Sequence, residues 1–243
     1  MSLGKIILFA STFIVLATAC EADRCFKRVG NLVVDKIEYD SFQALHIQGI
    51  FDVELVQDTV YYVEIMAYEQ VFNAVELKLN NDTLTCYNYN NCFWRSDFDR
   101  PFIRVHFPDI TILNIFEASY IYSTDSITDD FQFTIRSNIA EADIIFNCKS
   151  VFFYINGTSG GRYIFRGKTD KAYLMNVNTG LFEMDELECK TAKVLNYSFI
   201  DMKVNVLEKL YVEIYNSGNI RYKGSPEVIY DTLTSSGRAI PMD

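Results

Sequence analysis

Hydrophobic and polar residues alternate in short runs along most of the chain, as they do in β-strands that bury one face. From residue 107 onward the runs form units of about twenty residues, each with two runs separated by a small polar break. The breaks begin at Asn178, Asn196, Asn216 and Ser235. Such regular spacing of short strands predicts stacked coils, so we expect a parallel β-solenoid over residues 107–243.

Longer alternating runs precede the repeats, in an N-terminal β region over residues 41–106. Runs that begin at His46, Tyr61 and Phe102 predict successive strands. The turn signal Asn80-Asn81-Asp82 predicts a hairpin between two further runs. The pattern leaves open whether these strands continue the stack or form a small attached sheet. The chain is predicted to be all-β, without a long amphipathic helix.

Strand alternation sorts the side chains of the repeats into inward apolar rows and outward charged rows. If the breaks align, the outward rows contain Glu183, Asp201 and Arg221, and next to them Asp185, Lys203 and Lys223. Opposite charges on neighbouring strands would then lie about 5 Å apart and would favour this register slightly.

The N-terminus is typical of an exported protein. An apolar stretch over residues 6–19 is shorter than the ~20 residues of a membrane-spanning helix and reads as a secretory signal. Small residues precede Cys20 directly, as in the lipobox of bacterial lipoproteins. We predict a signal peptide over residues 1–19, lipidation of Cys20 and a tether over residues 20–40. Plain secretion, with Cys20 incidental, is the alternative.

Composition agrees with an envelope protein rich in β-structure. The chain has 243 residues, of which 15% are aromatic, and a net charge of -10. An acidic surface repels phosphate backbones, which excludes nucleic acid as the expected partner. We expect an outer-membrane lipoprotein that faces the periplasm or the cell surface. Its partners would be the outer membrane, through the lipid anchor, and an unknown glycan or protein ligand.

Cysteine usage fits an oxidising compartment. Cys86 and Cys92 flank a short polar loop, which makes them the candidate pair for a hairpin disulfide; the sequence leaves open whether they pair. Cys148 and Cys189 lie about two repeats apart, which places them too far from each other for a disulfide, and we interpret both as small buried hydrophobes. The cysteine spacing matches no zinc pattern and the chain has only two histidines, so no metal or cofactor is expected.

Two segments resemble a known family. The first follows a Gly-x-Phe-Asp-Val-x-Leu pattern, carried here by Gly49, Phe51, Asp52, Val53 and Leu55. The second comprises the glycine-containing turns Asn216–Pro226 and Ser235–Arg238. Over roughly residues 38–243 the chain is similar to the putative auto-transporter adhesin head domain, or GIN domain. The resemblance implies a right-handed parallel β-helix-like solenoid on a lipidated or secreted bacterial protein, and no agreed activity.

One outward cluster is a candidate ligand face, formed by Glu183, Asp185, Asp201, Lys203 and Arg221. Parallel β-helices also host polysaccharide lyases, in which carboxylates could hold calcium and Arg or Lys could abstract a proton. The alternative for these residues is a solvated charge ladder. Because no catalytic motif is present, we predict a non-catalytic, adhesin-like binding module. A carbohydrate-active enzyme of the lyase type and a purely structural envelope protein are the alternatives.

Exposed aromatic side chains could stack on sugars. The tyrosines that alternation places outside include Tyr120, Tyr122, Tyr197 and Tyr215. A chain this rich in tyrosine also exposes some of them by chance, so the pattern alone does not define a sugar site.

Asp-Ser/Thr-apolar triplets occur four times and resemble the O-glycosylation acceptor of some Gram-negative bacteria. The acceptor residues would be Thr59, Thr83, Ser126 and Thr232. Turn chemistry is the alternative, since Asp and Thr are common between strands.

Overall fold

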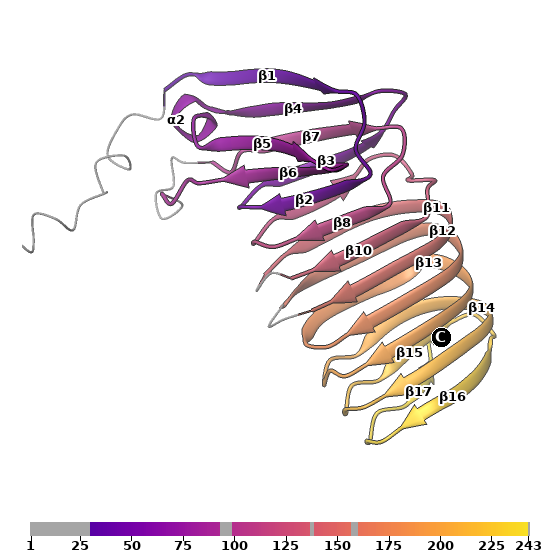
Figure 1. The fold of residues 1–243 in the computed structure, drawn as a ribbon. Helices are drawn as coiled ribbons and strands as arrows, with labels where there is room; N and C mark the ends of the chain where they lie inside the picture. Colours follow the sequence, from indigo (N-terminus) through magenta and orange to yellow (C-terminus); the bar gives the residue numbers. More distant parts are fainter. Residues whose placement is uncertain (1–29, 93–98, 137–138, 157–159, 243) are drawn as a thin grey trace, which may run out of the picture.

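The chain folds into an elongated stack of strands, described by a computed structural model over residues 30–92, 99–136, 139–156 and 160–242 (Figure 1). It is nearly all-β, with 68% strand and 2% helix, and forms a β-solenoid of about 6 turns with a spacing near 20 residues. The predicted fold class is therefore confirmed.

The N-terminal elements are β1 (Leu32–Tyr39), β2 (Ala44–Gln48), β3 (Asp52–Gln57), β4 (Tyr61–Tyr68), α2 (Glu69–Phe72), β5 (Val75–Asn80), β6 (Thr83–Asn88) and β7 (Phe102–Phe107). The repeats contain β8 (Ile112–Ile115), β9 (Tyr120–Ser123), β10 (Phe131–Ile135), β11 (Glu141–Ile155), β12 (Gly160–Asn176), β13 (Thr179–Asn196), β14 (Met202–Ile214), β15 (Ile220–Lys223), β16 (Glu227–Leu233) and β17 (Ala239–Pro241).

Two parallel walls make up the solenoid. Wall A contains, in order, β6, β2, β8, β10, the second halves of β11 to β14, and β16. Wall B contains β7, β3, β9, the first halves of β11 to β14, then β15 and β17. Each long strand thus runs along wall B, bends, and continues into wall A of the next coil.

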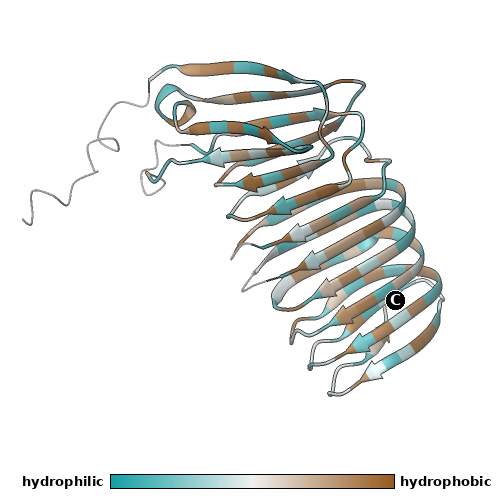
Figure 2. Cartoon of the chain, in the orientation of Figure 1, coloured by the Kyte–Doolittle hydropathy of each residue, from teal (hydrophilic) through white to brown (hydrophobic). Residues whose placement is uncertain are grey.

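The core lies between the walls and is filled by large aromatic side chains. Phe153 of wall A is fully buried, and its ring centroid lies 4.9 Å from that of Phe165 and 4.9 Å from that of Phe182, both on wall B. Inward positions are apolar on successive strands, and the hydropathy colouring alternates along each strand accordingly (Figure 2). Alternation in the sequence therefore reports the two faces of each wall correctly.

The first coils are not stacked in chain order. β2 and β3 pair with β8 and β9 on one side and with β6 and β7 on the other, so the chain returns to add an outer coil before it continues. Antiparallel strands β1 and β4 extend wall B, and β5 pairs with β6. The N-terminal region therefore both continues the stack and adds strands to it, which the sequence left open.

Two local features of this region bear on the predictions. Asn81 and Asp82 adopt φ values of 44° and 61°, the left-handed geometry of a tight hairpin, as their turn signal predicts. β1 covers residues 32–39 and pairs along its whole length with β4, so this part of the predicted tether region is a strand. The alternation over residues 32–39 is too weak to predict a strand there.

Buried asparagines hold the sharp turn that leads from wall A to wall B. Asn176 and Asn196 pair in register, and both side chains are fully buried. The Asn196 side-chain amide donates to the Ile200 carbonyl at 3.0 Å, and its oxygen accepts the Ser198 N–H at 2.9 Å. Asn176 makes the equivalent bonds to Gly180 and Asn178. The repeat break that begins at Asn178 is thus equivalent to Ser198, not to Asn196.

Replacing Asn196 with alanine is expected to destabilise the protein by about 2 kcal/mol, because a buried N–H and a buried carbonyl lose their partners. The matched control is Asn216→Ala, whose exposed amide should contribute less than about 0.5 kcal/mol. Urea unfolding followed by circular dichroism measures both. Equal midpoints for the two variants would contradict the role given to the buried amide.

The cysteine prediction is wrong for one pair. Cys86 is a free, buried thiol on β6, where alternation points it into the main core. Cys92 is disulfide-bonded, but not to Cys86, and it packs with Ala67 and Val71 in a separate small cluster. Cys148 and Cys189 are free, as predicted. Thr169 lies between them in register, so they are two strands apart.

Candidate ligand-binding face

The outer face of wall B is a ladder of ion pairs, which we call the charged face; it is formed by Asp143, Arg162, Arg166, Glu183, Asp185, Asp201, Lys203, Arg221 and Lys223. Glu183 pairs with Arg162 on one side and with Lys203, at 3.2 Å, on the other. Arg221 contacts Asp201 at 2.6 Å. The charges of neighbouring strands therefore neutralise each other.

The predicted rows of outward charges are wrong at the unit that contains Asp201 and Lys203, which was aligned two residues out of register. In register, Glu183 lies opposite Lys203, and Lys203 lies opposite Arg221, so Asp201 does not belong to this row. Asp201 precedes β14 and accepts hydrogen bonds from the backbone and side chain of Asn219. Asp185 instead reaches Lys223 at 2.8 Å. The error follows from aligning Asn196 with Asn178, which shifted one unit by two residues.

The carboxylates of the charged face are held in the ionised form. Burial alone would raise the pKa of Glu183, but hydrogen bonds from Arg162 and Lys203 outweigh it and lower the pKa. Burial would likewise raise the pKa of Asp185, but the hydrogen bond from Lys223 outweighs it and lowers the pKa. Burial alone would also raise the pKa of Asp201, but hydrogen bonds from Asn219 and Arg221 outweigh it and lower the pKa. General acid–base catalysis needs a pKa near the working pH, which none of these groups offers.

Stability should fall in acid because of these carboxylates. A depressed folded-state pKa adds stability above the unfolded value, and that stability is lost as the pH falls through the folded value. The ordinary values are 4.5 for Glu183 and 3.8 for Asp185 and Asp201. We expect a nearly constant Tm from pH 7 to about 5 and a steep decline below about 4.5.

The decline should be shallower in Asp201→Asn than in the parent, since one contributing carboxylate is removed. The control is Glu117→Gln, which removes an exposed carboxylate outside the ladder. Thermal unfolding between pH 7 and 3 measures the slopes. Parallel slopes for the parent and Asp201→Asn would contradict the assignment.

The outer face of wall A differs sharply from the charged face. Many of its outward positions carry aromatic and apolar side chains, which we call the aromatic face: Phe152, Tyr154, Tyr173, Met175, Leu195 and Tyr211 lie on β11 to β14, and Tyr197 and Tyr215 directly follow β13 and β14. Lys193 and Glu213 lie among them in register. Phe152 and Tyr173 are stacked, with centroids 4.7 Å apart and planes 5° apart. Tyr197 and Tyr215 are stacked at 4.1 Å. Parallel in-register pairing places like side chains on adjacent strands, which produces these stacks.

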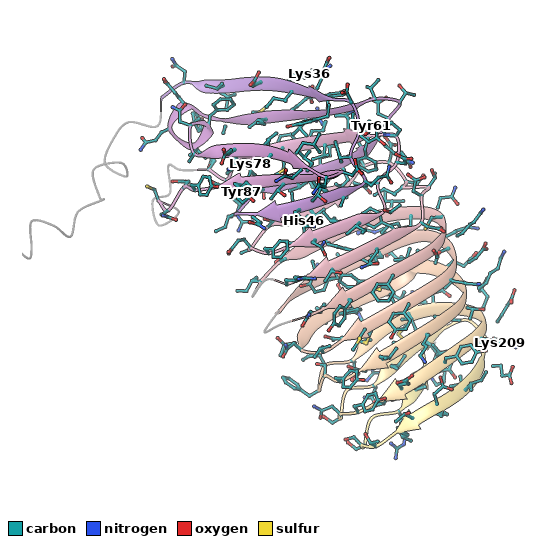
Figure 3. All side chains as sticks on the ribbon, viewed as in Figure 1. Lys36, His46, Tyr61, Lys78, Tyr87 and Lys209 are labelled. Atoms are coloured by element: carbon teal, nitrogen blue, oxygen red, sulfur yellow. The ribbon has the colours of Figure 1, made fainter. Side chains whose placement is uncertain are left out.

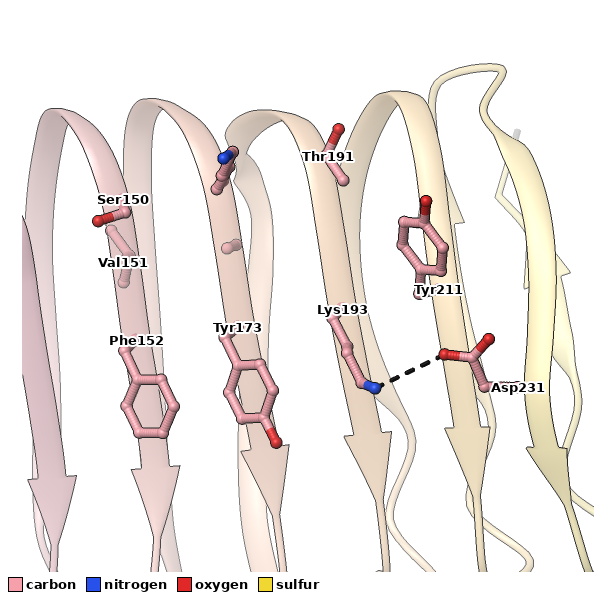
Figure 4. A pocket seen from close by; sticks show the side chains of 10 residues that line it. Ser150, Val151, Phe152, Tyr173, Thr191, Lys193, Tyr211 and Asp231 are labelled. Carbon is pink, nitrogen blue, oxygen red and sulfur yellow. Dashed lines mark ion pairs between the residues drawn. The ribbon is translucent and has the colours of Figure 1, made fainter.

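A groove of about 550 Å³ lies on the aromatic face. Phe152, Tyr173, Lys193 and Tyr211 line it from four successive strands (Figure 4). Register pairing places Lys193 between Tyr173 and Tyr211. Volumes of this size occur in small-ligand sites, and the lining here combines three aromatic rings with polar side chains such as Lys171 and Thr191.

Lys193 forms ion pairs with two carboxylates. Its ammonium lies 2.6 Å from Glu213 and 3.6 Å from Asp231, the contact drawn in Figure 4. Hydrogen bonding to Glu213 raises the pKa of Lys193, and the bonds from Lys193 and Tyr215 lower the pKa of Glu213. These two ion pairs therefore hold the ammonium of Lys193 and neutralise its charge.

Sequence reasoning identified only part of this face. Tyr197 and Tyr215 lie on it, whereas Tyr120 and Tyr122 are stacked on wall B. The groove residues Phe152, Tyr173 and Tyr211 were not predicted. Each of the three occupies an outward position in its own coil. The row that they form can be recognised in the sequence only when the units are aligned in the correct register.

The structure shows where the predicted glycosylation residues lie but does not test their modification. Thr59 is exposed in a turn, where its N–H donates to the Asp58 carboxylate at 2.6 Å, as turn chemistry requires. Thr83, Ser126 and Thr232 are half-buried. Glycosylation of these four residues stays a prediction. Cys20 lies outside the described residues.

The described residues contain neither a metal-binding cluster nor a membrane-spanning helix. Within residues 30–242, apart from the gaps given above, no group of three His, Cys, Asp or Glu side chains is arranged to hold a metal ion. The same part of the chain has no helix whose length and hydrophobicity would let it cross a bilayer.

Comparisons with known proteins agree on the fold. Residues 41–226 match the family described as "Putative auto-transporter adhesin, head GIN domain". A putative adhesin from Bacteroides fragilis NCTC 9343 superposes with a TM-score of 0.77 at 16% identity, over 87% of this chain and 97% of that chain. A putative adhesin from Parabacteroides merdae ATCC 43184 gives a TM-score of 0.64 at 16% identity, over 88% and 98%.

A third solved structure carries a different name. A putative lipid binding protein from Parabacteroides distasonis ATCC 8503 superposes with a TM-score of 0.63 at 17% identity, over 88% of this chain and 98% of that chain. Identities this low establish a common fold and nothing about ligands. No curated protein matches the sequence.

Proposed function

Because the chain belongs to the family described as putative auto-transporter adhesin, head GIN domain, we propose that it is an adhesin-like binding module that holds its ligand on the aromatic face. The observation that carries the proposal is the groove lined by Phe152, Tyr173 and Tyr211. Exposed aromatic surface is costly to leave in water, and large apolar patches rimmed by polar groups mark interaction sites. A glycan is the first candidate ligand, since sugar rings pack on aromatic side chains.

We propose that the module is non-catalytic. The charged face, which was the candidate lyase site, consists of neutralised ion pairs, and the pKa values of its carboxylates are lowered. A lyase needs a base that is free to take a proton. Arg221 is hydrogen-bonded to Asp201, and Lys203 to Glu183, which supports a role for these residues in register and solubility.

A glycan array combined with an assay for unsaturated uronide products tests this function. We expect the protein to bind at least one glycan class and to release no product. Product that disappears in Arg221→Gln would overturn the non-catalytic proposal. Absence of binding to glycans and to extracellular matrix proteins alike would favour a purely structural envelope component instead.

We also propose that the module is an outer-membrane lipoprotein anchored through Cys20, on the periplasmic or the outer side. Support comes from the short apolar segment and from the small residues before Cys20. Cells fed a radioactive fatty acid should label the parent protein, and Cys20→Ala should carry no label. Equal labelling of both, or none in the parent, would remove the anchor.

A further inference from the structure

The position of the groove restricts what can bind in it. The aromatic part of the groove lies on β11 to β14, each hydrogen-bonded to neighbours on both sides, and the groove reaches β16, the last strand of wall A, through Asp231. Backbone N–H and C=O groups of β11 to β14 are already paired, so a peptide cannot add itself as a further strand over the aromatic rings. Recognition must come from side chains alone, which here are aromatic rings, hydroxyls such as that of Thr191, and lysines.

The lysines along one margin of the groove lack carboxylate partners. On wall B, every lysine and arginine of β12 to β15 lies within an ion pair; these are Arg162, Arg166, Lys168, Lys203, Arg221 and Lys223. Lys149, Lys171 and Lys209 are exposed and form no ion pair with any described residue. They lie where β11, β12 and β14 bend into wall A, and Lys209 projects from this bend (Figure 3).

Lysines and carboxylates share this margin, but three of the lysines stay outside ion pairs with the described residues. Asp170 pairs with Lys190 at 2.6 Å, and its pKa is lowered first by that hydrogen bond and also by the charges of Lys149 and Lys171. The charges of three lysines thus act on Asp170, and Glu208 acts in turn on Lys190. Lys209 lies opposite Glu227 on β16 without an ion pair. In a chain with a net charge of -10, unpaired lysines beside an aromatic groove are a local exception.

The geometry matches a ligand that is flat and apolar on one side and anionic along one edge. Lys171 lines the groove, and Thr191 separates it in register from Lys209, so the two lysines are two strands, or about 10 Å, apart. Tyr173 and Tyr211 lie on the same strands as these lysines and have the same separation. A polymer lying across the strands would meet one aromatic ring and one ammonium group at both positions.

Resting on the proposed function, we propose that the ligand is an acidic glycan whose sugar rings pack against Tyr173 and Tyr211 while its carboxylates contact Lys171 and Lys209. Uronic acid and sialic acid polymers share this chemistry, and a binding experiment distinguishes them.

The test uses polygalacturonate, hyaluronate and polysialic acid, each compared with its carboxyl-reduced, neutral form, and the purified full chain. We expect at least one acidic polymer to bind about tenfold more tightly than its reduced form, and the advantage to shrink at high salt. Lys171→Gln/Lys209→Gln should weaken that binding about tenfold. The control Lys36→Gln/Lys78→Gln removes the same charge from exposed lysines of β1 and β5 and should change it less than about twofold.

Equal binding of acidic and reduced polymers, or no binding of any of the acidic polymers, would overturn the acidic-glycan inference. So would equal losses in the two lysine double variants. None of these results touches the proposed function, which fails separately if Tyr173→Ala/Tyr211→Ala leaves the binding of every array ligand unchanged. Thermal unfolding of each variant establishes that a lost signal reflects lost contacts and not lost structure.

Discussion

Replacing Phe153 with alanine is expected to lower the free energy of unfolding by about 4 kcal/mol, because it opens a cavity at the centre of the aromatic core. The side chain is fully buried. Its ring centroid lies 5.1 Å from that of Phe133 on the same wall and 4.9 Å from those of Phe165 and Phe182 on the opposite wall. The lost contacts therefore include those that hold the walls together.

The neighbouring residue provides the control. Phe152 points outward onto the aromatic face and is only half-buried, so Phe152→Ala should cost less than about 1 kcal/mol. Chemical denaturation of the two variants compares identical substitutions one residue apart. Similar losses would contradict the assignment of inward and outward faces on which the description of both walls depends.

Removing the two groove tyrosines together is expected to weaken ligand binding about 100-fold. Aromatic side chains at the centre of a binding surface commonly contribute about 1.5 kcal/mol or more each, and two such losses amount to about 3 kcal/mol. The variant is Tyr173→Ala/Tyr211→Ala, and its Tm should stay close to that of the parent because both side chains are on the outer face. Titration of the array-identified glycan measures the affinity.

The opposite wall again offers a matched variant. Tyr120 and Tyr122 are stacked at 5.4 Å on the outer face of wall B, so Tyr120→Ala/Tyr122→Ala removes the same chemistry from the other side. We expect its affinity to stay within about twofold of the parent. A larger loss in this variant than in the groove variant would move the binding surface to wall B.

Alternation and period sufficed to predict the fold, because both are direct consequences of strand geometry. Side chains of a strand point alternately to two faces, and coils of similar length repeat the pattern at a constant interval. Met184 and Met202 occupy inward positions of this alternation, and both are buried.

Register and non-local pairing were harder to predict. Asn196 resembles Asn178 as a turn residue, yet its buried amide makes it the equivalent of Asn176, and this distinction appears only in its hydrogen bonds. The return of β6 and β7 to the far side of β2 and β3 leaves no local signal. The error for Cys86 has a similar origin, since closeness in sequence to Cys92 outweighed its inward position on β6.

The binding face was missed because it is a property of several coils together. A single outward aromatic residue carries little information, since such residues are common on protein surfaces. Phe152, Tyr173 and Tyr211 become informative as a row, and the row requires the correct register. The charged residues are easier to recognise in the sequence because their signs alternate. In the structure they pair with each other, which leaves few charged groups free for a ligand.

Hydroxyl-radical footprinting with and without the array-identified glycan tests the central claim, that the aromatic face of wall A binds the ligand. Tyrosine oxidation reports solvent access residue by residue, and both walls carry outward tyrosines. We predict that ligand protects Tyr173 and Tyr211 from oxidation and leaves Tyr120 and Tyr122 unchanged. Protection of Tyr120 and Tyr122 with Tyr173 and Tyr211 still reactive would contradict the claim.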